Sequence, residues 1–343
     1  MILKTSATLL AAFVMTGAMC LAAPLQSAGS LTFGPNGVLF VGDSVGGQIV
    51  AFETADTVKS AAQPVEVKAI NDKLAALLGV MPSDVTINDV AVNPVSKRIY
   101  LSVHRGKGAD AMPLIIRTDS SGKLEVLEVA KMKSTAAALP NAAKGGRMDT
   151  ITDLAYLDGK VLVAGLTNEE FSSNMRTIDY PFGKVERGAS VEIWHTQHGQ
   201  FETNSPVRTF TPYMIDGQQS ILAAYTCTPL VKIPMSELKA GAKVMGTTVT
   251  ELGLGNRPLD MITYKKNGKD YLLMANSSRG MMKMDLTNVG KLEKLTKQVD
   301  FAGLKPDAIA ELNDVLQLDK YDDAMAVVLK GKGTLDLKSV ALP

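Results

Sequence analysis

Residues 87–104 read Ile87-Asn-Asp-Val-Ala-Val-Asn-Pro-Val-Ser-Lys-Arg-Ile-Tyr-Leu-Ser-Val-His104. Two apolar runs rich in β-branched residues flank an Asn-Pro turn, a pattern typical of two antiparallel strands. The same plan returns from Ile151, from Leu259 and from Leu312, each time with an aspartate near the start of the first apolar run. We therefore expect the chain to repeat one small β unit.

The repeat extends over most of the chain. The residues that open successive first strands lie about 50 to 65 residues apart, and they are Ser30, Asp89, Asp153, Pro212, Asp260 and Asp314. Short strands at turn-marked intervals, without long amphipathic helices, indicate an all-β fold. A six-bladed β-propeller fits best, because radial repetition buries both faces of every sheet. An eight-bladed propeller and a sandwich are the alternatives.

Three segments have a more specific interpretation. Residues 71–79 predict a short helix, residues 65–70 a fourth strand of the first unit, and residues 131–147 a loop between units. The chain after Asp314 is long enough for only three strands. The outer strand of the sixth unit is therefore either missing or supplied by the N-terminal part.

The N-terminal residues 1–22 have the features of an export signal. Lys4 supplies a positive start, residues 9–23 are apolar and small, and Cys20-Leu-Ala22 has small residues at the positions that a signal peptidase reads. We expect cleavage near Ala22, which leaves residues 23–343 as a single propeller domain in the periplasm or outside the cell. An uncleaved N-terminal anchor is the alternative. No later segment has the roughly 20 apolar residues of a membrane span.

The composition excludes some partners. Lys and Arg total 36, Asp and Glu total 35, and the formal net charge is +1. Such a balance gives no field for nucleic acid or anionic lipid. After cleavage Cys227 is the only cysteine, so no internal disulfide can form and burial of the core must hold the domain.

Polar residues are expected to gather on one face of the propeller. In this fold the first strands line the central channel, and the second-to-third loops lie where those strands begin. One set of polar residues opens the inner strands and consists of Asp89, Asp153, Asp260 and Asp314. A second set lies at or after the ends of the second strands and consists of Asp43, His104, Asn168, Cys227 and Asn276. Arg105 and Arg257 lie in the same loops and are suited to a carboxylate or phosphate. We predict a site for a small molecule or a protein partner there.

Each of these residues also has a structural interpretation. An Asp at the start of a strand commonly accepts hydrogen bonds from backbone N–H groups of the adjoining turn. The arginines could instead pair with neighbouring aspartates. Cys227 is either an inert thiol or, with a nearby base, a nucleophile.

Asn88-Asp-Val-Ala-Val-Asn-Pro and Thr152-Asp-Leu-Ala-Tyr-Leu-Asp-Gly resemble the broad propeller superfamily of NHL-repeat, YncE-like and SMP-30/gluconolactonase-like proteins. SMP-30-like members are metal-dependent lactonases with a Glu/Asn/Asn/Asp metal set. The resemblance implies Asn168, Asn276 and Asp314 as metal ligands, with Asp43 or Ser30 where the family has Glu. Oxygen ligands at a channel mouth suit Ca²⁺. A metal-dependent hydrolase and an envelope interaction scaffold are therefore the alternatives to a binding protein.

Two further segments stand out. Residues 168–187 predict an unusually long second-to-third loop, which is either a lid or partner surface or an edge hairpin on its own blade. The segment Trp194-His-Thr-Gln-His198 resembles a metal pair, but zinc and copper need three or four ligands. We expect a turn with two solvated imidazoles, on the face opposite the channel mouth.

Overall fold

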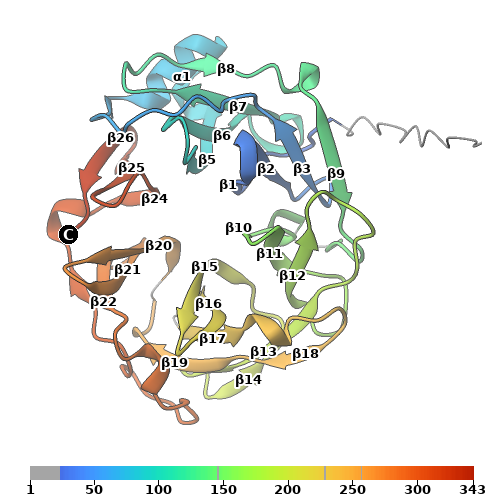
Figure 1. The fold of residues 1–343 in the computed structure, drawn as a ribbon, viewed down its shortest axis with the longest axis vertical. Coiled ribbons are helices and arrows are strands. Elements are labelled where there is room, and N and C mark those ends of the chain that lie inside the picture. The colour runs from blue at the N-terminus through green and yellow to red at the C-terminus, as the bar shows by residue number, and fades with distance from the viewer. Residues whose placement is uncertain (1–23, 145–146, 228, 256) are drawn as a thin grey trace, which may run out of the picture.

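The computed structural model describes residues 24–144, 147–227, 229–255 and 257–343. The predicted signal peptide, residues 1–22, lies outside these ranges. The described residues form six β-sheets in a ring about a central channel, which confirms the predicted six-bladed propeller (Figure 1). Within the same ranges, no helix combines the length and the apolar character needed to cross a bilayer.

Each blade starts with an inner strand at the channel and adds antiparallel strands outward. Blade 1 contains β1 (Leu31–Phe33), β2 (Val38–Asp43), β3 (Gln48–Glu53) and β9 (Ser134–Ala138). Blade 2 contains β5 (Val85–Val92), β6 (Ile99–Arg105), β7 (Met112–Thr118) and β8 (Glu125–Val126). Blade 3 contains β10 (Asp153–Leu157), β11 (Lys160–Leu166), β12 (Ser173–Asp179), β13 (Ala189–His195) and β14 (Gln200–Glu202), and β18 (Lys243–Met245) also pairs with β13.

The remaining blades follow the same plan. Blade 4 contains β15 (Val207–Ile215), β16 (Gln218–Tyr225), β17 (Pro229–Pro234) and β19 (Thr247–Glu251). Blade 5 contains β20 (Pro258–Lys266), β21 (Lys269–Asn276), β22 (Gly280–Asp285) and β23 (Asp307–Ala308). Blade 6 contains β24 (Val315–Lys320), β25 (Met325–Lys332), β26 (Thr334–Ala341) and β4 (Glu66–Val67).

Tight turns join the inner strand to the second strand in blades 3, 4 and 5. The turn residues are Asp158-Gly159, Asp216-Gly217 and Asn267-Gly268, and all six have positive φ. Two successive residues with positive φ match the right-handed twist of a hairpin, and Asn, Asp and Gly adopt this conformation most readily. These turns set the register in which inner-strand side chains face the channel.

The blades do not follow one another around the ring in chain order. The inner strand β1 packs beside both β5 and β10, and β24 packs beside β5 and β20. Blade 2 therefore lies between blade 6 and blade 1, at the top of Figure 1. The core agrees, because Phe40 of blade 1 packs in one cluster with Val161 of blade 3, and Ile99 of blade 2 packs with Leu329 of blade 6.

The N-terminal part of the chain closes the ring. Strand β4 pairs with β26 through Leu337↔Val67 and Lys338↔Glu66. The predicted strand at residues 65–70 thus belongs to blade 6 and not to the first unit, and it supplies the outer strand that the C-terminal part lacks. The predicted helix is confirmed as α1 (Ile70–Leu78), which packs over blades 2 and 6.

Strand β9 corrects the interpretation of residues 131–147 as a loop. It pairs along the whole outer edge of β3, from Gln48↔Ala138 to Phe52↔Ser134. The chain therefore leaves blade 1 after three strands, completes blade 6, builds blade 2, and returns to finish blade 1. The small residues of Ser134–Ala138 gave no strand signal because the strand is short and mostly exposed.

The long loop predicted at residues 168–187 is also wrong, because it contains β12. This strand pairs with β11 over its full length. Its polar residues Asn174 and Arg176 are buried, so the strand lacks the apolar alternation that would have marked it. Tyr180 and Phe182, which follow it, contact the ring of Phe40 in blade 1.

The extra strand changes the place of the two histidines. With β12 as the third strand, β13 is the fourth, and it runs antiparallel to β12 through Met175↔Ala189. Its last residue, His195, therefore lies toward the face where the inner strands begin, not toward the opposite face.

Candidate functional site

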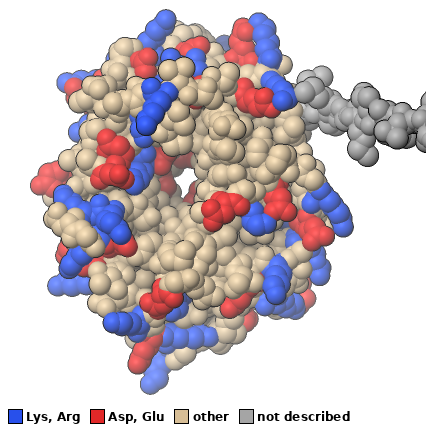
Figure 2. All heavy atoms as spheres, in the orientation of Figure 1, with Lys and Arg blue, Asp and Glu red and all other residues tan. Residues whose placement is uncertain are grey.

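The mouth face is the face on which the inner strands begin and the second strands end. Figure 2 shows the channel as an opening at the centre of the ring. Acidic and basic side chains are interspersed around it in that view, without a large patch of one sign.

The inner-strand aspartates connect neighbouring blades. Oδ1 of Asp153 accepts the N–H of Leu154 at 2.7 Å, and Oδ2 accepts the N–H of Phe210 in blade 4 at 2.8 Å. Asp89, Asp260 and Asp319 repeat this arrangement, each with the next residue of its own strand and with Leu31, Leu318 and Val92 of the adjacent blades, respectively. The structural interpretation therefore accounts for both oxygens of each carboxylate.

In blade 6 this role belongs to Asp319, which the sequence reasoning missed, and not to Asp314. Asp319 lies near the end of β24 and pairs with Val327. Asp314 precedes β24, is exposed, has a φ of 61°, and forms an ion pair with Lys332 at 3.1 Å. The repeat spacing could have identified Asp319, because it follows Asp260 by the same interval as Asp89 follows Ser30. Asp314 thus lies outside the set of channel carboxylates.

The channel raises the pKa values of these carboxyls. Burial raises the pKa of Asp153 to about 7 and that of Asp319 to about 6, in spite of the backbone N–H groups that they accept. Burial also raises the pKa of Asp89 and of Asp260 well above the ordinary carboxyl value, and repulsion among the channel carboxylates adds to the effect. The four line a cavity of about 170 Å³.

Asp43 holds the N-terminal segment of the described chain. Its fully buried carboxylate accepts five hydrogen bonds, from the backbone N–H groups of Gln26, Ser27 and Gly46, from the Ser27 hydroxyl and from the Gln48 amide, at 2.8–3.0 Å. A carboxylate with five donors has little capacity left for a metal ion.

His104 contacts the same segment. Its Nε2 accepts the N–H of Ala28 at 3.1 Å, and Nδ2 of Asn88 donates to the Ala28 carbonyl at 2.8 Å. Burial lowers the pKa of His104, and the nearby Asp43 carboxylate partly opposes this shift. The ring is therefore neutral at pH 7 with its proton on Nδ1, because Nε2 acts as an acceptor.

Two cavities flank this segment on the mouth face. One, of about 280 Å³, lies over the channel and includes the ion pair between Asp149 and Arg208. The other, of about 480 Å³, lies between blades 1 and 2 and includes His104, Thr86 and Lys107. Ser27 and Met148 line both. Of the predicted ligand residues, His104 is the one that faces the larger cavity.

The other predicted residues lie apart from these cavities. Oδ1 of Asn276 accepts N–H groups of its own turn, including those of Ser278 at 3.0 Å and Arg279 at 3.2 Å. Asn168 and Arg257 are exposed, and Arg105 ends β6 with its Nη1 near the sulfur of Met112. The predicted metal set of Asp43, Asn168, Asn276 and Asp314 is distributed over blades 1, 3, 5 and 6.

Cys227 occupies the turn between β16 and β17, with a φ of 60°. It forms no disulfide and is half-buried. Because the ring order is not the chain order, blades 1 and 3 both separate it from His104 in blade 2. A pairing of this thiol with that imidazole is therefore not present.

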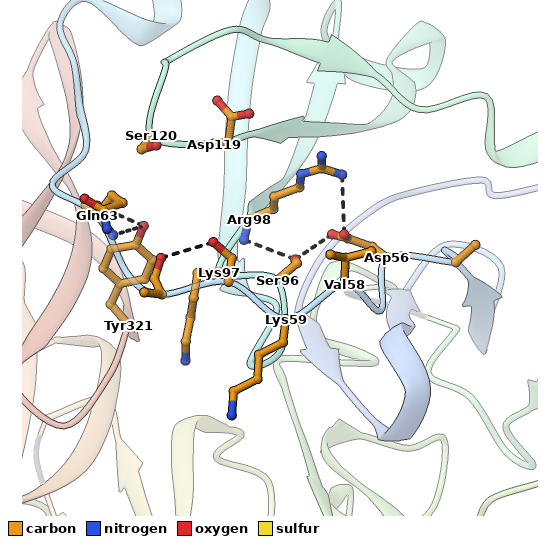
Figure 3. Close-up of a pocket in the computed structure, with 13 residues that line it drawn as sticks. Asp56, Val58, Lys59, Gln63, Ser96, Lys97, Arg98, Asp119, Ser120 and Tyr321 are labelled. Carbon is orange, nitrogen blue, oxygen red and sulfur yellow. Dashed lines mark hydrogen bonds and ion pairs between the residues drawn. The ribbon is translucent and has the colours of Figure 1, made fainter.

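A third cavity, of about 460 Å³, opens on the opposite face, where the first hairpin of blade 2 meets the link from blade 1 to blade 6. Figure 3 shows Arg98 directed toward Asp56, while Lys59 and Lys97 extend side by side. Asp56 accepts hydrogen bonds from Ser96 and Tyr100 and pairs with Arg98 at 3.4 Å. The sequence reasoning did not identify this cavity, because four distant segments line it.

A cluster of ligand-type side chains lies at the outer edge of the mouth face. His195, His198 and Glu202 converge in the hairpin of β13 and β14 in blade 3. The sequence reasoning stopped at the two histidines. The signal that could have extended it is Glu202, four residues after His198.

No protein-family model and no curated protein matches the chain. Among solved structures it is similar to a glucose dehydrogenase, with 13% identity and a TM-score of 0.41 over 94% of this chain and 98% of that one. It is also similar to the PQQ-bound aldose sugar dehydrogenase of Streptomyces coelicolor, with 11% identity, a TM-score of 0.35, and coverage of 93% and 96%. The major allergen Mala s 1 of Malassezia sympodialis is similar as well, with 10% identity and a TM-score of 0.42 over 92% of this chain and 93% of that one.

Proposed function

We propose that this protein is an exported six-bladed propeller that binds a small molecule in the 480 Å³ cavity beside His104. The observation that carries the proposal is a cavity of ligand size on the mouth face, bounded by a neutral imidazole. Sites for small molecules are typically concave and about 300–1,000 Å³ in volume. The channel itself, at about 170 Å³, is smaller than that range.

The lining suggests the kind of ligand. Val45, Ala111 and Met148 contribute apolar contact, and Thr86 and Gln26 contribute polar groups. Lys107 is the charged residue among those that line the cavity. The carboxylate of Asp43 lies beneath this lining, and both of its oxygens already accept hydrogen bonds. A neutral or singly negative molecule with one apolar face fits this chemistry.

The metal-dependent hydrolase has less support. Asp43 accepts five donors, Asp314 pairs with Lys332, and Asn276 caps its own turn. Calcium needs six to eight oxygen ligands that are free to turn toward the ion. If Ca²⁺ raised the melting temperature by several degrees and Asn276→Ala abolished the rise, the hydrolase would replace the binding protein as our proposal.

The binding proposal can be tested with a thermal-shift screen of neutral and singly negative small molecules, followed by equilibrium dissociation constants for the hits. Thr86→Trp should fill the cavity and weaken binding at least about tenfold. The matched control is Ser120→Trp, which fills the cavity on the opposite face. Equal affinity in the wild type and in Thr86→Trp would contradict the assignment, and loss of binding only in Ser120→Trp would move the site to the other face.

Export is a separate part of the proposal and rests on the predicted signal peptide. N-terminal sequencing of the protein recovered from the periplasm or medium should begin near residue 23. Recovery from the cytosol with Met1 intact would contradict export and leave the cavity proposal in place.

A further inference from the structure

We propose that His195, His198 and Glu202 form a zinc site in the hairpin of β13 and β14 in blade 3. Each residue offers one ligand atom, and these atoms lie within 4.8 Å of one another. Nδ1 of His195 is 2.5 Å from Oε2 of Glu202, and Nδ1 of His198 contacts Oε1 of the same carboxylate. The proposed site is independent of the cavity beside His104.

The local fold explains why these side chains meet. His195 ends β13 and pairs with Gln200, the first residue of β14. His198 lies in the turn between the two strands, which brings its ring to a centroid distance of 4.0 Å from that of His195. The short hairpin therefore places three ligand-type residues, at positions i, i+3 and i+7, around one point.

Contacts with blade 5 hold the hairpin in place. Nε1 of Trp194 donates to the Lys297 carbonyl at 3.4 Å, and Nε2 of Gln197 donates to the Val299 carbonyl at 3.2 Å. The amide of Gln298 donates back to the carbonyl of Gln197 at 2.8 Å. A ligand set held by long-range contacts on its outer side loses less conformational freedom when an ion binds.

The donor set suits zinc. Two imidazole nitrogens and one carboxylate leave a fourth tetrahedral position for water. Zinc bonds of roughly 2.0–2.2 Å place neighbouring ligand atoms about 3.3 Å apart, so the present contacts need to open by less than about 1 Å. Calcium takes oxygen ligands, and therefore two imidazoles argue against it.

Burial and charge favour an ion at this point. The His195 ring is 2% exposed, and within the described chain its Nε2 has no hydrogen-bond partner, so Nδ1 makes the polar contact of the ring. The side chain of His198 is 46% exposed and provides a way in from solvent. Glu202 supplies the carboxylate of the cluster, and it contacts both imidazoles and the Ser205 hydroxyl.

The surroundings supply a second layer of contacts. The Ser205 hydroxyl donates to Oε2 of Glu202, and Nε2 of Gln200 donates to Oε1 at 3.3 Å. Such contacts orient a ligating carboxylate. They allow Glu202 to turn one oxygen toward the ion while it keeps a partner on the other.

The test is zinc titration of the full-length, tag-free protein by calorimetry, after treatment with a chelator. We expect one Zn²⁺ per chain, release of protons on binding, and a rise of a few degrees in melting temperature. Glu202→Gln and His198→Gln should each weaken binding at least about tenfold. Cobalt(II) added in place of zinc should give the intense visible absorption of a tetrahedral site.

The third histidine of the chain provides a matched control, since His104→Gln should leave zinc affinity unchanged. His198 lies in an exposed turn, so its variant remains informative if Glu202→Gln fails to fold. Absence of stoichiometric binding, or binding that both variants retain, would overturn the site and leave two imidazoles hydrogen-bonded to a carboxylate.

Discussion

The centre and the edge of the mouth face use polar residues in opposite ways. At the centre, Asp43, Asp153 and His104 accept hydrogen bonds from backbone N–H groups and so hold the blades and the N-terminal segment together. At the edge, the side chains of His195, His198 and Glu202 contact one another, and among the described residues none of them hydrogen-bonds a backbone group. Side chains that accept hydrogen bonds from the backbone are needed for the fold, whereas side chains that contact each other can still bind a ligand.

The largest effect should come from Asp43→Asn. The change leaves buried N–H donors without an acceptor, and we expect a loss of about 2–4 kcal/mol in the free energy of unfolding, measured with urea. Asp314→Asn is the control, because it alters only an exposed ion pair and should cost less than about 0.5 kcal/mol. Equal costs would show that Asp43 is not a structural residue.

The channel carboxylates should make stability depend on pH. Their folded-state pKa values, about 7 for Asp153 and about 6 for Asp319, lie above the unfolded value near 4. The unfolded chain therefore releases protons first as pH rises, and stability contributed by these groups is complete below about pH 4 and is lost by about pH 7.

Asp153→Asn removes one of these groups. Its melting temperature should fall less than that of the wild type, by a few degrees, between about pH 5 and pH 8. Calorimetric scans at several pH values measure the two slopes. Parallel slopes would mean that the carboxyl titrates as in water and that the channel is well hydrated.

His104→Ala tests the second backbone contact at the centre. Loss of the acceptor for Ala28 should cost about 1 kcal/mol at pH 7.5. The lowered pKa of His104 means that its contribution is present above about pH 6.5 and is lost on acidification, because a protonated ring cannot accept the hydrogen bond. The difference between wild type and variant should therefore shrink at pH 5, as urea unfolding would show.

The smallest effect should come from His198→Gln in metal-free protein. The side chain is half-exposed and serves no backbone group, so its loss should change the free energy of unfolding by less than about 0.5 kcal/mol. Urea unfolding with a chelator present measures this. A cost above about 2 kcal/mol would place the edge cluster with the structural residues and remove the contrast between the two regions.

Prediction from the chain succeeded where the signal was local. Asn-Gly and Asp-Gly turns, the apolar run that begins at Ile99 and the helix after Ile70 each depend on neighbouring residues, and these elements lie where they were expected. Strands β9 and β12 were missed. Strand β9 consists of small residues and is mostly exposed, and β12 contains the buried polar residues Asn174 and Arg176. Their patterns depend on partners that are distant in sequence.

The residues of the candidate sites also fall into features that the sequence predicted and features that it did not. The acidic residues that recur at strand starts were visible in the sequence, and so were His195 and His198. Their partners were not, because these depend on which N–H groups and carboxylates the ring brings within 3 Å. Asp319 and Glu202 had a signal in their spacing, but the groups that they contact became known only once β24 and β14 were placed.

By itself, the sequence determined the all-β repeat and the number of blades, because both follow from turn chemistry and strand spacing along the chain. Only the tertiary structure decided that blade 2 lies between blades 6 and 1, that β4 closes the ring, and which polar side chains still have capacity for a ligand. These features arise from strand pairing across more than 250 residues in one case and from competition for backbone donors in the other. Neither is encoded in any single stretch of the chain.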